Sequence, residues 1–439
     1  MERSESQLRM RDTAREIFNH ALAEASIARA FARHVHCEPG VLRVRDDLYD
    51  LHSYSRVFAV SIGKAGHTMA EALAAQMGTH AVEGIVASPG EVSAQVHGFR
   101  YFHGGHPTPN AESIRAAKAI LKSLEVQNAA TLVIFLLSGG GSSIVEKLID
   151  DDVALDDLVA TYRALVHSGA PIGEINAIRK HLSAVKGGRL AQAAYPAHQV
   201  SLLVSDVPDS MLDALASGPT MPDSTTATDC YAIAEKYDLL PRFPPSTREL
   251  FERRALEETP KSDDHAFYHS RWWPILSNQS AIEEASVAAE RAGFVVQVDN
   301  SCDDWDYERA ADYLLERLRE LRKQFGRLCL ISGGEVTVKV TDGGVGGRNQ
   351  QFALDCARKI AGENITVLSA GTDGIDGNSS AAGAVVDGTT LDRAQMLGLD
   401  AQAALKKFDA YPFFKALGDV VEIGPTGNNL RDLRVLLAY

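Results

Sequence analysis

Short apolar runs, most of them followed by a glycine turn, recur along the first half of the chain. They occupy 56–62, 82–88, 131–137 and 200–205, and stretches with helical spacing separate them. Before them, apolar residues recur at helical spacing over 13–31, which predicts an amphipathic helix. Near-continuous apolar strands alternating with helices are typical of a parallel sheet covered on both faces. The pattern therefore predicts a doubly wound, Rossmann-like α/β domain.

The stretch 238–274 differs in character, because it is rich in proline and contains the polar run 261–265. We place a domain boundary there, which predicts domains at 1–240 and 241–439. After the boundary, the predicted helices are 279–292 and 304–325, and the predicted strands are 295–298, 328–332, 336–340 and 365–369. Strict apolar alternation in 336–340 indicates an antiparallel strand, hence a second α/β domain with a mixed sheet.

Charge and composition narrow the class of function. The chain has 44 Lys and Arg against 58 Asp and Glu, a net charge of −14, which argues against nucleic acid or membranes as partners. The polar N-terminus lacks the apolar core of a signal peptide, and the most apolar run, 132–137, is too short to span a bilayer. A cytoplasmic protein is expected. The sequence does not give the oligomeric state, and a homodimer stays open.

The 35 glycines gather in turns after predicted strands, beside charged or hydroxyl side chains. Such a turn has a structural interpretation, because glycine lets a helix begin close to a sheet. It also has a functional one, because bare amides at a helix start bind anions. Lys64 lies at the predicted start of a helix, where its positive charge is unfavourable beside the positive end of the helix dipole. This position favours an anion-binding role for the lysine. The serine-rich turn 138–143 suits either a capped helix or a phosphate cradle.

Carboxylates and cations follow other strands. Asp206 comes directly after an apolar run, Asp373 lies in the turn 371–377 that follows another, and Arg348 follows the glycine loop 343–347. Cations that neutralise phosphate, with carboxylates for Mg²⁺ and for an attacking hydroxyl, are what phosphoryl transfer requires. The chain contains neither the dinucleotide fingerprint GxGxxG after a strand nor the P-loop pattern GxxxxGK[ST]. This absence argues more strongly against an enzyme that uses a nicotinamide cofactor than against a kinase, because some kinases have no P-loop.

The motifs at 62–66, 137–143, 179–189 and 205–208 together resemble the N-terminal domain of the glycerate 2-kinases. Those at 332–335, 346–350, 369–377 and 424–427 resemble the C-terminal MOFRL domain of the same family. The resemblance runs in unbroken order from about residue 12 to 434. It implies a kinase that phosphorylates the small molecule D-glycerate with ATP and Mg²⁺, usually on the 2-hydroxyl, in an interdomain cleft.

The resemblance also implies roles for individual residues. Lys64 and Arg348 would bind substrate and the transferring phosphoryl group. Asp206 and Asp373 would orient the metal or the attacking hydroxyl. The other residues expected to bind substrate or nucleotide are Gly63, Ser138, Gly139, Gly140, Gly141, Ser142, Ser143, Lys180, Lys186, Gly333, Gly334, Glu335, Gly346, Gly347, Asn349 and Asn429. Which glycine turn holds the nucleotide stays open.

Two departures from the family pattern affect acids near the expected site, because Gln351 and Ser380 stand where the family usually has acidic residues. Two other functions remain as alternatives. Many members of the family are labelled hydroxypyruvate reductases that use NADH or NADPH, and a non-catalytic anion-binding protein would use the same turns.

Overall fold

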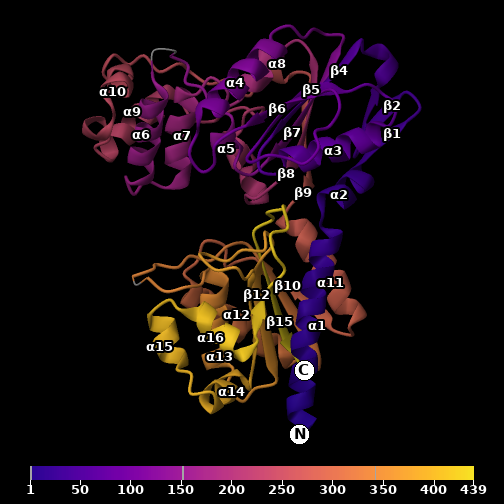
Figure 1. Ribbon diagram of the computed structural model, residues 1–439, viewed down its shortest axis with the longest axis vertical. Helices are drawn as coiled ribbons and strands as arrows, with labels where there is room; N and C mark the ends of the chain where they lie inside the picture. The colour runs from indigo at the N-terminus through magenta and orange to yellow at the C-terminus, as the bar shows by residue number, and fades with distance from the viewer. Residues whose placement is uncertain (1, 151–152, 342) are drawn as a thin grey trace. The chain divides into compact units, whose positions relative to one another are not determined.

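The computed structural model describes residues 2–150, 153–341 and 343–439, which form two compact units (Figure 1). One unit is the continuous segment Ile27–Ile275, and the other joins Met1–Ser26 to Leu276–Tyr439. This division differs from the predicted one at 240/241 in two respects. Residues 241–275 end in a strand that extends the sheet of the first unit, and the N-terminal helix packs on the sheet of the second.

The continuous unit contains two sheets and the helices that cover them. Its strands are β1 (Val35–Glu38), β2 (Val41–Val44), β3 (Asp47–Asp50), β4 (Arg56–Ile62), β5 (Glu83–Ser88), β6 (Phe99–His103), β7 (Thr131–Ser138), β8 (His198–Val204) and β9 (Ser270–Leu276). Its α-helices are α2 (Ile27–His34), α3 (Gly66–Met77), α4 (Ala111–Leu124), α5 (Gly141–Ile144), α6 (Leu155–Val166), α7 (Ile172–Leu182), α8 (Arg189–Ala194), α9 (Ala227–Lys236) and α10 (Pro245–Glu252).

The larger of these sheets has the strand order β6-β5-β4-β7-β8-β9, and β4 to β8 pair in parallel. Chain order reverses between β4 and β7, so the carboxyl ends of these two strands form the topological switch point of the sheet. β7 is buried along its whole length, as expected of a central strand covered on both faces. The predicted doubly wound fold is confirmed; the small antiparallel sheet β1-β2-β3 and strand β6 were not predicted.

The discontinuous unit has a mixed sheet of order β10-β11-β15-β12-β13-β14. Its strands are β10 (Val295–Val298), β11 (Leu328–Gly333), β12 (Ile365–Gly371), β13 (Gly383–Asp387), β14 (Val420–Val421) and β15 (Asp432–Ala438). Its helices are α1 (Glu2–Glu24), α11 (Asn278–Arg291), α12 (Tyr307–Arg322), α13 (Arg348–Lys359), α14 (Thr390–Met396), α15 (Ala401–Lys406) and α16 (Ala410–Leu417).

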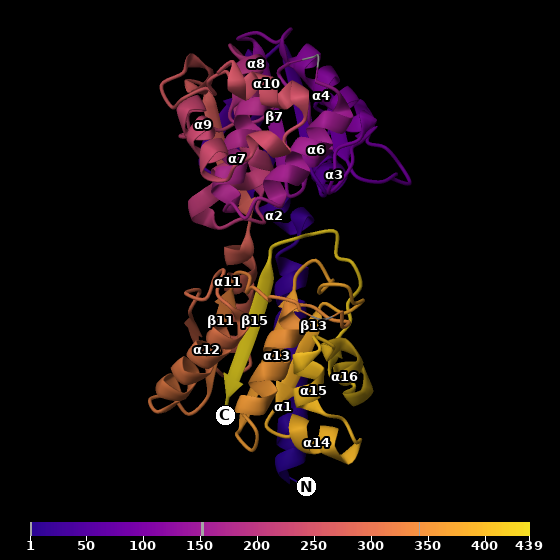
Figure 2. The ribbon, with the colours of Figure 1, turned by 90° about the vertical axis from the view of Figure 1, so that its left-hand side faces the viewer.

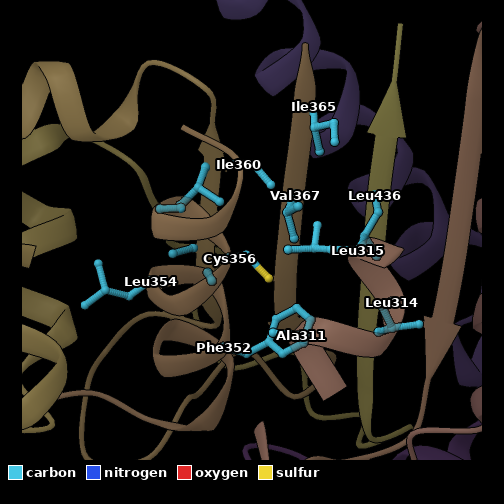
Figure 3. Packing of buried hydrophobic residues seen from close by; sticks show 14 of the residues in the cluster. Ala311, Leu314, Leu315, Phe352, Leu354, Cys356, Ile360, Ile365, Val367 and Leu436 are labelled. Atoms are coloured by element: carbon cyan, nitrogen blue, oxygen red, sulfur yellow. The ribbon is translucent and has the colours of Figure 1, made fainter. Parts of the chain in front are cut away.

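Alternate residues of this mixed sheet enter two apolar cores. One core joins the sheet to α12 and α13, and Figure 3 shows Leu315, Phe352 and Cys356 reaching toward its strands. The other joins the sheet to α1 and α11, and α1 and α13 lie on opposite faces in Figure 2. Arg11 ties α1 to this unit through buried ion pairs with Asp387 at 3.1 Å and Asp419 at 2.8 Å.

Two predicted elements differ from the structure. The single helix predicted over 13–31 is two helices, α1 and α2, separated at Ala25 and Ser26. The mixed sheet is confirmed, but the alternating run 336–340 is not a strand of it and makes an isolated bridge through Thr337. The antiparallel pairing of the mixed sheet comes instead from β15, which pairs with both β11 and β12, and from β13, which pairs with β12.

The helices of the described residues include none whose length and apolar character together would let it cross a membrane.

Candidate functional site

The first group of predicted residues gathers at the switch point between β4 and β7. Gly63 and Lys64 follow β4, while Ser138 ends β7, Gly139 and Gly140 follow it, and Gly141–Ser143 begin α5. Open α/β sheets bind ligands outside the carboxyl ends of their strands at such a point. We call Gly139–Ser143 the first glycine turn. The amides of Gly141 and Ser142 open α5 and have no acceptor within that helix.

The first glycine turn is locked to the turn after β4. Lys64 donates its backbone N–H to the carbonyl oxygen of Gly139 at 2.9 Å, and Ala65 donates to Ser138 Oγ at 3.1 Å. Gly63 has φ +126°, and a Cβ there would lie 2.2 Å from Ser138 Oγ. Ser138 is buried between the two turns, so its hydroxyl serves to join them.

Lys64 and His106 flank the first glycine turn. A Cβ on Gly140 would lie 3.1 Å from Lys64 Cγ and 2.9 Å from His106 Cδ2, so both side chains pack against this glycine. Partial burial and the charge of Lys64 lower the pKa of His106. The sequence analysis missed His106; the glycine pair 104–105 that follows a strand and precedes it could have indicated this residue.

Asp206 reaches the same turn from the end of β8. A Cβ on Gly139 would lie 1.9 Å from Asp206 Oδ2, so only glycine leaves room for this carboxylate. The hydroxyls of Ser142 and Ser217 hydrogen-bond to each other, and Ser143 Oγ donates to the carbonyl oxygen of Gly140 at 3.3 Å. Lys64, Asp206 and the first glycine turn are therefore brought together at one edge of the sheet.

The two predicted lysines of the segment 179–189 are buried in ion pairs. Lys180 Nζ lies 3.0 Å from Asp213 Oδ2 and 3.2 Å from Asp223 Oδ1. Lys186 pairs with the fully buried Glu146, and burial lowers its pKa. Their placement favours a structural role in holding the chain around the first glycine turn, because carboxylates of the protein already contact both ammonium groups.

The second group of predicted residues surrounds Arg348, the first residue of α13. Arg348 donates to Asp432 through Nε at 2.6 Å and Nη2 at 3.0 Å, and its Nη2 also lies 2.7 Å from Glu335 Oε1. Burial alone would lower the pKa of Arg348, but these carboxylates outweigh burial and raise it. Burial and Asp432 raise the pKa of Glu335. The guanidinium is thus charged and held by a carboxylate, Asp432, that the sequence analysis did not identify.

Asp376 caps the start of α13. It accepts hydrogen bonds from the backbone N–H groups of Asn349 at 3.0 Å and Gln350 at 2.9 Å. Burial raises its pKa to about 6, although these amides oppose the shift. Asn349 is buried too and accepts a hydrogen bond from Ser369 at 2.6 Å, so it fixes the helix start and does not face a ligand.

The predicted glycine turn after β11 is satisfied by the protein itself. The three amides from 333 to 335 donate to the side-chain oxygens of Asn300, Asn278 and Asp303, at 2.8, 3.0 and 3.0 Å respectively. An anion would have to displace all three side chains. This turn therefore differs from the first glycine turn, and it positions Glu335 without serving as a cradle.

A cavity of about 670 Å³ opens beside Arg348 within the discontinuous unit. Its lining includes Glu335, Gly346, Gly347 and Asp373, together with apolar residues from 336–340, 375 and 408. Asn429 is not part of this lining, and its Oδ1 accepts the Arg431 N–H at 3.0 Å. The expectation that substrate and nucleotide meet between two domains stays a prediction.

Metal binding was expected at Asp206 and Asp373. Throughout the described ranges, no group of three or more His, Cys, Asp or Glu side chains is arranged to hold a metal ion. Mg²⁺ commonly needs only one or two protein carboxylates, because nucleotide phosphates and water supply its other ligands. The donor set at Asp373, on the cavity wall, fits that mode of binding.

Two family models match the chain. The model described as a domain of unknown function, DUF4147, covers residues 13–252, and the MOFRL family model covers 328–432. The first lies mainly in the continuous unit and begins within α1, while the second lies wholly in the discontinuous unit.

Curated relatives resemble the chain over most of its length. A D-glycerate 2-kinase of Thermotoga maritima is 37% identical over 86% of this chain and 89% of its own. The glycerate kinase of Homo sapiens is 30% identical over 98% and 94%, and a putative hydroxypyruvate reductase of Agrobacterium vitis is 35% identical over 87% of each chain. A solved glycerate kinase from Thermotoga maritima matches 98% of this chain and 99% of its own, with 33% identity and a TM-score of 0.86.

Proposed function

Since this chain belongs to the glycerate 2-kinase family, we propose that it catalyses ATP-dependent phosphorylation of D-glycerate, with 2-phosphoglycerate as the product. The observation that carries the proposal is the placement of Lys64 and Asp206 around the first glycine turn, at the switch point of a parallel sheet. Amides and a cation suit the carboxylate of a small acid, and a carboxylate of the protein can accept a hydrogen bond from its hydroxyl.

In the proposed mechanism, Lys64 and the amides of the first glycine turn hold the glycerate carboxylate. Asp206 orients the hydroxyl that attacks, and Arg348 stabilises negative charge on the transferring phosphoryl group. Such a transfer is in-line and depends mainly on positioning and charge, because its loose transition state needs little covalent chemistry from the protein. Mg²⁺ bound with ATP would offset phosphate charge, and Asp373 would supply a carboxylate oxygen for it.

The experiment is a coupled assay of ADP release with D-glycerate, followed by phosphorus NMR of the product. Multiple turnovers would exclude a non-catalytic binder, and the spectrum distinguishes 2- from 3-phosphoglycerate. Lys64→Ala and Arg348→Ala should each lose about 3 kcal/mol or more of transition-state stabilisation. Lys122→Ala, an exposed lysine on α4, is the matched control and should keep wild-type kcat/KM. Near-wild-type kcat/KM in both site variants would refute these roles.

A second candidate arises because some relatives are named putative hydroxypyruvate reductases. Mixing the protein with hydroxypyruvate and NADH and following the absorbance of NADH tests this activity directly. The kinase proposal expects no NADH oxidation.

A further inference from the structure

Resting on the proposed function, we propose that the cavity beside Arg348 is the nucleoside pocket, which leaves the first glycine turn to glycerate. A volume of about 670 Å³ lies within the range of about 300–1,000 Å³ typical of small-molecule pockets. Glycerate, a three-carbon acid, would leave most of this space to water. A nucleotide would fill it.

One wall of the cavity is apolar and open to solvent. Val338, Val340 and Ile375 line it, and Val340 and Ile375 are 62% and 46% exposed. Glycerate has no apolar surface to cover such a wall, whereas a nucleobase has a flat, largely apolar face. Burial of that face against these side chains would remove them from water, which is favourable.

Strained backbone at one point of the lining supports a ligand site. Phe408 has φ +53°, in the left-handed region that bulky side chains avoid. Such conformations persist where surrounding structure enforces them, and they concentrate at ligand clamps. The glycine loop packs closely against this residue, since a Cβ on Gly344 would lie 2.3 Å from the carbonyl oxygen of Phe408. Val345 N–H also donates to Asp409 Oδ1 at 2.9 Å.

The polar groups of the cavity suit the rest of a nucleotide. Arg348 provides a fixed guanidinium for phosphate oxygens, because Asp432 and Glu335 already orient it. Asp304 is exposed on the lining, and a carboxylate at such a place accepts hydrogen bonds from ribose hydroxyls. The base therefore lies against the apolar wall, the ribose near Asp304, and the phosphates toward Arg348.

The test is calorimetric titration of the full chain with MgADP in the absence of glycerate. Ile375→Glu places a charge in the apolar wall and should raise the Kd for MgADP at least tenfold, while the KM for D-glycerate changes less than twofold. Met396→Glu, at a residue of the same unit that is 81% exposed and away from the cavity, is the matched control and should bind MgADP as the wild type does.

A second pair of measurements tests the ribose contact. The wild type should bind ADP at least fivefold more tightly than 2′,3′-dideoxy-ADP, and Asp304→Asn should abolish that preference. The inference is overturned if the wild type does not bind MgADP, if folded Ile375→Glu binds it normally, or if this substitution acts on the KM for D-glycerate instead. Binding at the cavity without any phosphorylation of D-glycerate would refute the proposed function and leave this inference standing.

Discussion

Asp432 holds Arg348 by two hydrogen bonds, at 2.6 Å from Nε and 3.0 Å from Nη2, while being itself buried at the start of β15. Asp432→Asn replaces the negative carboxylate by a neutral amide. Both Arg348 and the fully buried Arg434 then lose this carboxylate as an ionic partner. We expect kcat to fall about 100-fold through misplacement of Arg348. We also expect a loss of about 3–5 kcal/mol of unfolding free energy, because breaking one side of a buried ion pair is costly.

Glu335→Gln is the comparison for this prediction, since it weakens one contact of Arg348 and leaves the Asp432 pair intact. It should reduce kcat less and leave the fold nearly as stable. Equal effects of the two substitutions on kcat would show that Asp432 does not position Arg348.

Gly139→Ala tests whether the place of the Asp206 carboxylate matters. The added Cβ would occupy the position of Asp206 Oδ2, and Gly139 does not need a left-handed backbone, so the side chain of Asp206 must move while the fold remains. We expect kcat/KM to fall about tenfold or more with little change in Tm. Gly173→Ala, in α7 with open space around it, should keep full activity and gain about 0.5–1 kcal/mol. Unchanged activity in Gly139→Ala would remove Asp206 from the mechanism.

His106 should report on occupancy of the first glycine turn. Burial and Lys64 lower its pKa, so its imidazole should titrate below the ordinary value of about 6.5. Lys64→Met removes the neighbouring cation and should raise this pKa, and bound D-glycerate should raise it in the wild type by attracting the proton. Side-chain nitrogen NMR, with the signal assigned through His106→Asn, measures all three values. Identical titration in Lys64→Met would contradict the placement of the lysine.

Asp376 should make stability depend on pH in the opposite sense from an ordinary paired carboxylate. Its pKa is about 6 in the folded protein against 3.8 ordinarily, so between these values the folded state holds a proton that the unfolded state has lost. Its contribution is therefore most favourable below pH 3.8 and declines as pH rises through 6. From pH 5 to 7.5 the stability advantage of wild type over Asp376→Asn should shrink by about 1–2 kcal/mol, as urea unfolding would measure. A constant difference across this range would exclude the shift.

The sequence predicts four strands of the first sheet, β4, β5, β7 and β8, because each is a short apolar run, but it misses the edge strands β6 and β9. Lys64 and Asp206 both follow strands closely, and the topology of a parallel sheet brings such residues to one edge, where both lie beside the first glycine turn. Lys186 illustrates what local pattern cannot show, because its partner Glu146 is distant in sequence and only the fold buries the pair. Thr337 illustrates another limit, since apolar alternation predicts a strand but β15 takes the central position beside β11.

The discontinuous unit has a consequence for synthesis of the protein on the ribosome. Helix α1 precedes the continuous unit in the chain, yet its apolar side, including Phe18, packs against α11 and strands that are translated some 250 residues or more later. The continuous unit, Ile27–Ile275, is complete before any of these partners exists. During elongation the apolar face of α1 therefore has none of these partners to pack against. We expect the docking of α1 on this sheet to follow the synthesis of β15, the last strand of the unit.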